Sequence, residues 1–126
     1  MRPKILIVDD SKTVRLIVRQ AFKSYDCEIS EASTGVEGWT AAQQVLPDLI
    51  LLDVTMPVMN GPELLLKLKA HPTLAAIPII MLIVERDPPA VIQPGVHDHL
   101  RKPFQPDALL EKCRRIINLR PLVPVG

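Results

Sequence analysis

Three aspartates and one lysine follow strand-like segments, at positions where their side chains could act together. Asp9 and Asp10 come directly after an apolar run at residues 4–8, Asp53 follows the apolar segment DLILL, and Lys102 follows the last strand-like segment. Two adjacent carboxylates at the end of a buried strand repel each other and resist desolvation, so they persist where a cation or solvent relieves them. We therefore expect a cation beside Asp9 and Asp10.

The types of these residues indicate which cation and which reaction. Oxygen ligands from two or three carboxylates suit a hard cation, and a site that keeps several waters suits Mg²⁺. Such a site leaves coordination positions for a phosphoryl oxygen, and Lys102 adds a compact positive charge that can pair with a carboxylate or a phosphoryl group. Together these groups predict in-line phosphoryl transfer to a carboxylate, which depends chiefly on positioning and charge neutralisation.

The elements that must position these residues alternate between strand and helix. Apolar runs rich in β-branched residues predict strands, and helical spacing of apolar residues predicts helices, with Val36, Trp39 and Leu46 facing inward from the second helix. Alternating elements joined by short loops predict a parallel sheet with helices on both faces, whose sites lie at the carboxyl ends of the strands. The strands are expected at about residues 4–8, 26–31, 48–52, 77–84 and 97–101, and the helices at about 12–24, 35–46, 62–71 and 106–119.

Composition limits the remaining possibilities. The 126 residues, 48% of them hydrophobic, fit one domain at residues 1–120 followed by a proline-punctuated tail at 121–126. No apolar run is long enough to span a membrane and the N-terminus lacks the features of a signal peptide, so we expect a soluble, cytoplasmic protein. A net charge of +1 and 3% aromatic residues give no sign of nucleic-acid binding. Cys27 and Cys113 lie in apolar segments and are expected to be buried thiols.

Four fragments in order, KILIVDDS, LILLDVTMPVMNGPELL, IPIIML and LRKPF, resemble the receiver domains of two-component response regulators over almost the whole chain. The resemblance implies a flavodoxin-like (βα)5 fold with strand order 2-1-3-4-5, and a phosphoryl group accepted from a phosphohistidine on a sensor kinase or phosphotransfer protein. It also implies a cis bond between Lys102 and Pro103, and signalling through a downstream protein target. By position, it makes Asp53 the phosphoacceptor, Asp9 and Asp10 the Mg²⁺-binding acids, Thr55 the donor of a backbone carbonyl to the metal, and Lys102 the lysine of the family.

The sequence departs from the family pattern at three places. Ile83, followed by Val84, stands where the family has a Thr or Ser, so the hydroxyl that would bond the new phosphoryl group is missing. Residues 85–95 contain three prolines, which leaves room for at most one and a half helical turns, at 88–93, so the fourth helix should be short or absent. His99 occupies the place of an aromatic residue that rotates on activation. It could still move, or it could be an exposed strand histidine without a switching role.

Two other functions remain open. A pseudo-receiver would keep the fold and pocket but act as an interaction module that does not depend on phosphorylation, as Ile83 and the prolines suggest. A Mg²⁺-dependent phosphohydrolase would also place an aspartyl nucleophile at a strand end, but it typically needs a second carboxylate two residues later, where this chain has Thr55. The leading hypothesis is a phosphorylatable single-domain receiver that signals by protein contacts and is not a turnover enzyme.

Overall fold

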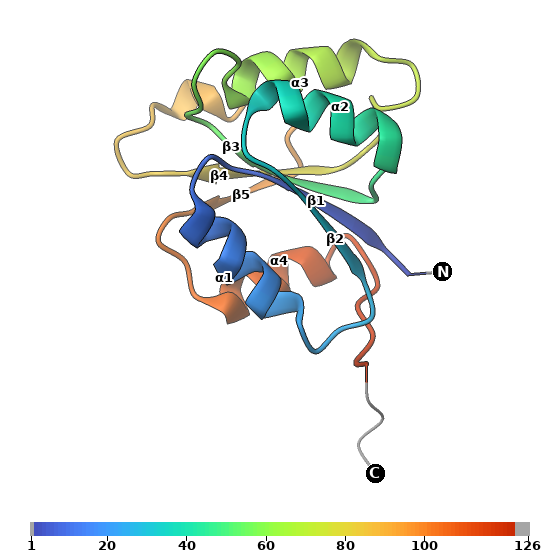
Figure 1. The fold of residues 1–126 in the computed structure, drawn as a ribbon. Helices are drawn as coiled ribbons and strands as arrows, with labels where there is room; N and C mark the ends of the chain where they lie inside the picture. Colours follow the sequence, from blue (N-terminus) through green and yellow to red (C-terminus); the bar gives the residue numbers. More distant parts are fainter. Residues whose placement is uncertain (1, 123–126) are drawn as a thin grey trace.

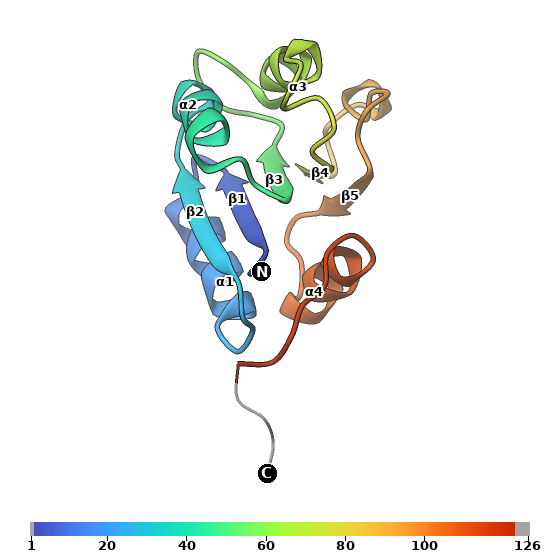
Figure 2. The ribbon, with the colours of Figure 1, turned by 90° about the vertical axis from the view of Figure 1, so that its right-hand side faces the viewer.

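A single parallel sheet of five strands organises the protein, in the order β2-β1-β3-β4-β5. The computed structural model describes residues 2–122. Helices α2 and α3 cover one face of the sheet and α1 and α4 the other (Figures 1 and 2). This doubly wound arrangement confirms the predicted flavodoxin-like fold and its strand order. The elements are β1 (Lys4–Val8), α1 (Lys12–Phe22), β2 (Glu28–Ala32), α2 (Gly35–Val45), β3 (Leu49–Asp53), α3 (Gly61–Ala70), β4 (Ile79–Ile83), the short 3₁₀ helix η1 (Pro89–Val91), β5 (Asp98–Arg101) and α4 (Pro106–Arg114).

The central strands are apolar along their length because both of their faces are covered by helices. Every residue of β3 and β4 is buried, and so is β1 after Lys4. The sheet divides the interior into two apolar clusters, one under α2 and α3 and the other under α1 and α4. Cys27 and Cys113 belong to the second cluster as free, buried thiols, as predicted.

Helix α2 packs through only part of the predicted face, because Trp39 contacts the core but Val36 and Leu46 do not lie inward. Val36 and Leu46 are about half exposed, whereas Gly38 and Ala42 are buried and Trp39 is partly buried. The reason is a close approach between the helix and the sheet: a Cβ on Gly38 would lie 2.9 Å from a methyl carbon of Val8. Small residues therefore form the inner stripe of α2, which a search for large apolar residues misses.

Helix α3 begins with a complete capping box. The Asn60 side chain accepts a hydrogen bond from the Glu63 amide at 3.0 Å, and the Glu63 carboxylate accepts one from the Asn60 amide at 3.2 Å. Pro62 occupies the first turn, as predicted, where its missing N–H costs nothing. The capping box thus fixes the start of α3, and the Gly61 amide joins it to the Val54 carbonyl, just after β3, at 2.8 Å.

The fourth helical region is reduced to the single turn η1, which confirms that it is short. The surrounding segment lies on the same face of the sheet as α3, beyond the end of β4 (Figure 2). Asp87 closes the turn after β4 by accepting a hydrogen bond from the Val84 amide at 2.8 Å. Val91 and Val96 pack against the core beneath this segment.

The last described residues run back along the turn that precedes β2. The Asp26 amide donates to the Arg120 carbonyl at 2.7 Å, and the Leu122 amide donates to the Ser24 carbonyl at 2.9 Å. Helix α4 ends at Arg114, before the predicted residue 119. The predicted tail at 121–126 is described only as far as Leu122, and its other residues lie outside the described part of the chain. Between residues 2 and 122, no helix is long and apolar enough to cross a bilayer.

Candidate functional site

The three strand-end aspartates meet at one edge of the sheet. Because β1 and β3 are neighbouring parallel strands, their carboxyl ends lie side by side. Carboxylate oxygens of Asp9, Asp10 and Asp53 all lie within 4.8 Å of one another. Asp9 and Asp53 are buried and Asp10 is exposed. The site is thus a carboxylate cluster with one side open to solvent.

Lys102 reaches this cluster from the segment after β5. Its Nζ lies 2.6 Å from Asp9 Oδ2 and 3.0 Å from Asp53 Oδ1, and its side chain is 15% exposed. The Lys102 amide donates to the Ile83 carbonyl at 2.6 Å, and the following bond to Pro103 is cis. Lys102 therefore supplies one positive charge to two buried acids, which leaves the cluster with a net negative charge.

The donor set fits a hard divalent cation. Asp9 Oδ1 accepts a hydrogen bond from the Ser11 amide at 2.9 Å. Asp9 Oδ2 touches Lys102, yet within residues 2–122 it accepts no hydrogen bond of suitable geometry. A fully buried carboxylate oxygen in this state has unused acceptor capacity directed into the acidic cluster. Three carboxylates with such an oxygen suit Mg²⁺, which favours oxygen ligands and retains water.

Burial and the neighbouring charges shift the titration of the site. Burial, followed by the charge of Asp9, raises the pKa of Asp53 from 3.8 to about 6, against the opposing effect of Lys102. Burial alone would lower the pKa of Lys102, but its contacts with Asp9 and Asp53 raise it. Lys102 thus remains charged near neutral pH, while Asp53 is held in an environment that disfavours its ionised form unless more positive charge is supplied.

Asp53→Asn is expected to stabilise the metal-free protein near pH 7 by about 2 kcal/mol. Because the pKa of Asp53 is higher in the folded than in the unfolded state, its contribution to stability is present below about pH 4 and is lost as the pH rises through about 6. Urea unfolding of both proteins in the presence of a chelator, at about pH 5 and pH 7, measures the difference in their free energies of unfolding. The advantage of the variant should shrink at the lower pH. An equal advantage at both pH values would contradict the assignment to Asp53.

Gly61 lets the backbone pass close beneath Asp53. Its amide donates to the Val54 carbonyl at 2.8 Å, and a Cβ at this position would lie 2.2 Å from the Asp53 carbonyl oxygen. Any side chain would displace either the start of α3 or the end of β3. Sequence reasoning placed the start of a helix at about residue 62 but did not recognise this contact, which depends on how two segments approach each other.

The other predicted positions lie in the loop after β3 and on strands β4 and β5. Thr55 is exposed in the loop after β3. Ile83 is 7% exposed at the end of β4, in the core under α3. His99 is exposed on the edge strand β5, paired in register with Met81.

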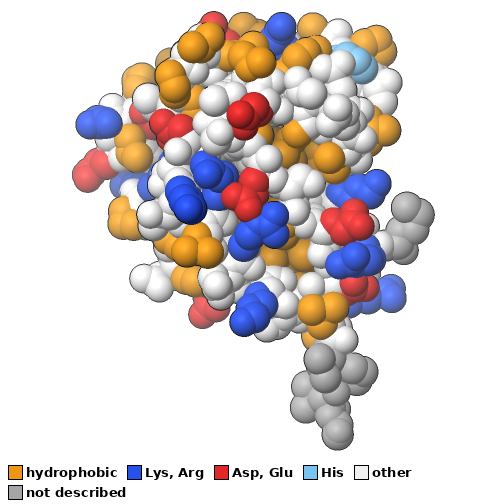
Figure 3. Space-filling view, in the orientation of Figure 1, with side chains coloured by type: hydrophobic (Ala, Val, Ile, Leu, Met, Phe, Trp, Pro, Cys, Tyr) orange, Lys and Arg blue, Asp and Glu red, His pale blue; other side chains and the backbone are white. Residues whose placement is uncertain are grey.

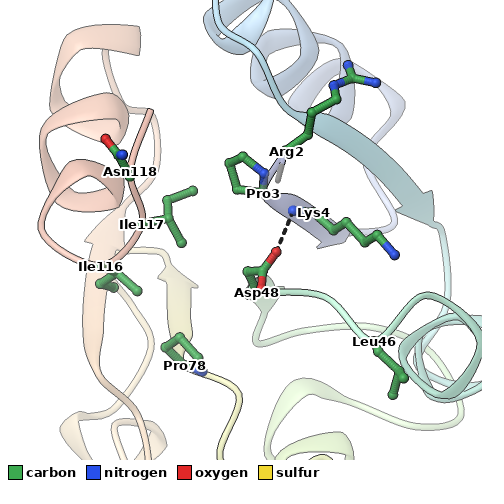
Figure 4. Close-up of a pocket in the computed structure, with 9 residues that line it drawn as sticks. All are labelled: Arg2, Pro3, Lys4, Leu46, Asp48, Pro78, Ile116, Ile117 and Asn118. Atoms are coloured by element: carbon green, nitrogen blue, oxygen red, sulfur yellow. Dashed lines mark hydrogen bonds between the residues drawn. The ribbon is translucent and has the colours of Figure 1, made fainter. Parts of the chain in front are cut away.

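A hollow at the opposite edge of the sheet contains none of the predicted site residues. It lies at the amino ends of β1, β3 and β4, where Arg2, Lys4, Asp48, Pro78 and Asn118 surround it (Figure 4). Within it, the Lys4 amide donates to Asp48 Oδ2 at 2.8 Å. The acidic cluster at the carboxyl ends of the strands is therefore the better candidate for the chemistry, because carboxylates and a paired lysine converge there.

Known proteins resemble this chain in sequence and in fold. The family model of the response regulator receiver domain matches residues 5–114. The chain is 36% identical over 120 residues to the chemotaxis protein CheY1 of Helicobacter pylori, covering 91% of this chain and 97% of that protein. It is 31% identical to the DNA-binding response regulator MtrA of Mycolicibacterium paratuberculosis, of which it spans 51%. The solved structure of the chemotaxis response regulator CheY4 of Vibrio cholerae matches with a TM-score of 0.83 at 33% identity, covering 93% of this chain and all of that one.

Proposed function

The chain belongs to the response regulator receiver domain family, and from this membership we propose that it accepts a phosphoryl group on Asp53 in a Mg²⁺-dependent reaction and signals through protein contacts. The observation that supports this most is the convergence of Asp9, Asp10, Asp53 and Lys102 at one sheet edge. In this proposal Asp9, Asp10, Asp53 and the backbone carbonyl of Thr55 hold the cation.

The reaction we propose is a displacement at phosphorus. A carboxylate oxygen of Asp53 forms a bond to phosphorus while the bond from phosphorus to a donor imidazole nitrogen breaks, and the electron pair leaves with that nitrogen. Bound Mg²⁺ would offset negative charge on the phosphoryl oxygens and the carboxylates. Lys102 holds the Asp53 side chain in place and adds positive charge where the phosphoryl group arrives.

The proposed donor is a sensor histidine kinase or a histidine phosphotransfer protein. The proposed receiver of the signal is a protein target whose identity the chain does not reveal. A matching relative is a chemotaxis protein and another is a DNA-binding response regulator, so the family connects this fold to more than one kind of output.

Incubation with acetyl phosphate and Mg²⁺ is expected to add one phosphoryl group per chain, detected by intact mass. Asp53→Asn should remove the adduct, whereas the control Asp107→Asn, in the first turn of α4 and outside the cluster, should retain it. Omission of Mg²⁺ should prevent the reaction. An adduct that persists in Asp53→Asn would refute the proposed acceptor.

A pseudo-receiver that works without phosphorylation is the second candidate. Ile83 favours it, because a buried hydrocarbon at the end of β4 cannot donate a hydrogen bond to a phosphoryl group. Absence of an adduct with acetyl phosphate, together with no binding of beryllofluoride, would select this function. If the adduct forms, hydrogen exchange across residues 83–104 before and after phosphorylation would show whether the change reaches the η1 segment, β5 and His99.

A further inference from the structure

We propose that Arg15 is a positioning residue for the metal site, acting through the backbone of Asp9. This inference rests on the proposed function, because it concerns the same acidic cluster. Arg15 lies on α1, and its Nη1 donates to the Asp9 backbone carbonyl at 2.7 Å. Its Nε donates to Glu31 Oε1, on β2, at 2.9 Å. The guanidinium group of Arg15 thus links two parts of the fold, the loop that contains Asp9 and Asp10 and the edge strand β2.

Two hydrogen bonds hold the backbone on either side of Asp10. The Asp9 carbonyl accepts from Arg15, and the Ser11 amide donates to the Asp9 carboxylate. Ser11 in turn caps α1 by accepting from the Val14 amide at 3.2 Å. Because the exposed Asp10 follows directly on the anchored carbonyl, its direction toward the cluster depends on this backbone anchor.

Arg15 is itself fixed by its surroundings. Its side chain is 15% exposed. Glu31 also accepts a hydrogen bond from Arg19, and this bond is the main reason why the pKa of Glu31 is lowered. Basic side chains with an acidic one among them gather over α1 (Figure 3). The Arg15 side chain is partly buried, and its guanidinium group is bonded to both Glu31 and the Asp9 carbonyl. It can therefore hold that carbonyl with little further loss of rotamer freedom.

Arg19 provides a matched control. It lies one turn farther along α1 and binds the same Glu31, but its other hydrogen bond goes to the Ile29 carbonyl at 3.2 Å. Removing either arginine takes away one positive charge and one contact with Glu31. Of these two substitutions, only that of Arg15 removes the hydrogen bond to the Asp9 carbonyl. Comparing the two variants therefore separates the effect of positioning the Asp9 backbone from the effects of losing a positive charge or of lowering the stability of the fold.

The test compares Arg15→Met and Arg19→Met in the full chain by calorimetric titration with Mg²⁺ and by hydrogen exchange of the metal-free protein. Arg15→Met is expected to weaken Mg²⁺ binding about tenfold, although the loss of a positive charge near the acids would by itself strengthen it. It should also speed exchange of the Ser11 amide. Arg19→Met should leave the Mg²⁺ affinity and the exchange of that amide close to those of the unaltered protein.

The outcomes distinguish this inference from the proposed function. Unchanged or tighter Mg²⁺ binding by Arg15→Met, or equal weakening in both variants, would overturn the role of Arg15. If the unaltered protein binds no Mg²⁺, the proposed function fails. The hydrogen-exchange comparison then still decides the anchoring role: faster exchange of Ser11 in Arg15→Met alone supports it, and the same exchange in both variants refutes it.

Discussion

Lys102→Met is expected to lower the free energy of unfolding by about 2–3 kcal/mol near pH 7 in the absence of metal. The lysine contacts two buried carboxylates, and its removal leaves them facing each other without a counter-charge. Protonation of Asp53 limits the loss, because Lys102 is one of the groups that keep its pKa from rising further. Urea unfolding should therefore show a smaller loss near pH 5 than near pH 7, and a smaller loss when Mg²⁺ is present.

Lys112→Met is the matched control for this prediction. Lys112 Nζ also lies 3.0 Å from a carboxylate, that of Asp98, but both side chains are 27% exposed. A partly solvated pair of this kind contributes under about 1 kcal/mol. Equal losses in the two variants would show that the buried cluster does not depend on Lys102 for charge balance.

Gly61→Ala is expected to destabilise the protein by about 3 kcal/mol or more and to weaken Mg²⁺ binding. The added Cβ would lie 2.2 Å from the Asp53 carbonyl oxygen, an overlap between two backbone segments that no side-chain rotation relieves. Since Asp53 would have to move, both stability and metal affinity should fall. Urea unfolding and calorimetric titration with Mg²⁺ measure the two effects.

Gly95→Ala tests whether any Gly-to-Ala change has this effect. Gly95 has a φ of +99°, which alanine adopts with strain, but the added Cβ would meet only the flexible side chain of Lys69. We expect a loss of roughly 1–2 kcal/mol and no change in Mg²⁺ affinity. A loss of metal binding in Gly95→Ala but not in Gly61→Ala would contradict the role given to the backbone contact at Asp53.

The sequence was sufficient to predict the fold and the meeting of the acids, because both follow from one-dimensional patterns. Apolar runs such as DLILL identify strands that are buried on both faces, and alternation with helices makes the strands parallel. In a parallel sheet, the residues that follow the strands all lie at the same edge of the sheet. The meeting of Asp9, Asp10 and Asp53 could therefore be predicted without knowing how their side chains pack. The prolines after Val84 likewise predicted a short η1 segment.

What could not be predicted depends on the approach of segments in space. The inner face of α2 consists of small residues, Gly38 and Ala42, whose burial reflects closeness to the sheet and carries no hydrophobic signal. The contact of Arg15 with the Asp9 carbonyl involves a backbone atom, which leaves no pattern in the residue types. The capping box at Asn60 and Glu63, by contrast, could have been found from its spacing.

The buried state of both native thiols makes this chain convenient for site-directed labelling. Burial raises the pKa of Cys27 and raises that of Cys113 to about 12. Because the thiolate is the form that attacks a thiol-reactive dye, both cysteines should stay unlabelled in the native protein. Val58 is 91% exposed in the loop beside the acidic cluster. A fluorophore attached through Val58→Cys would therefore label the loop after β3 without prior removal of either native cysteine.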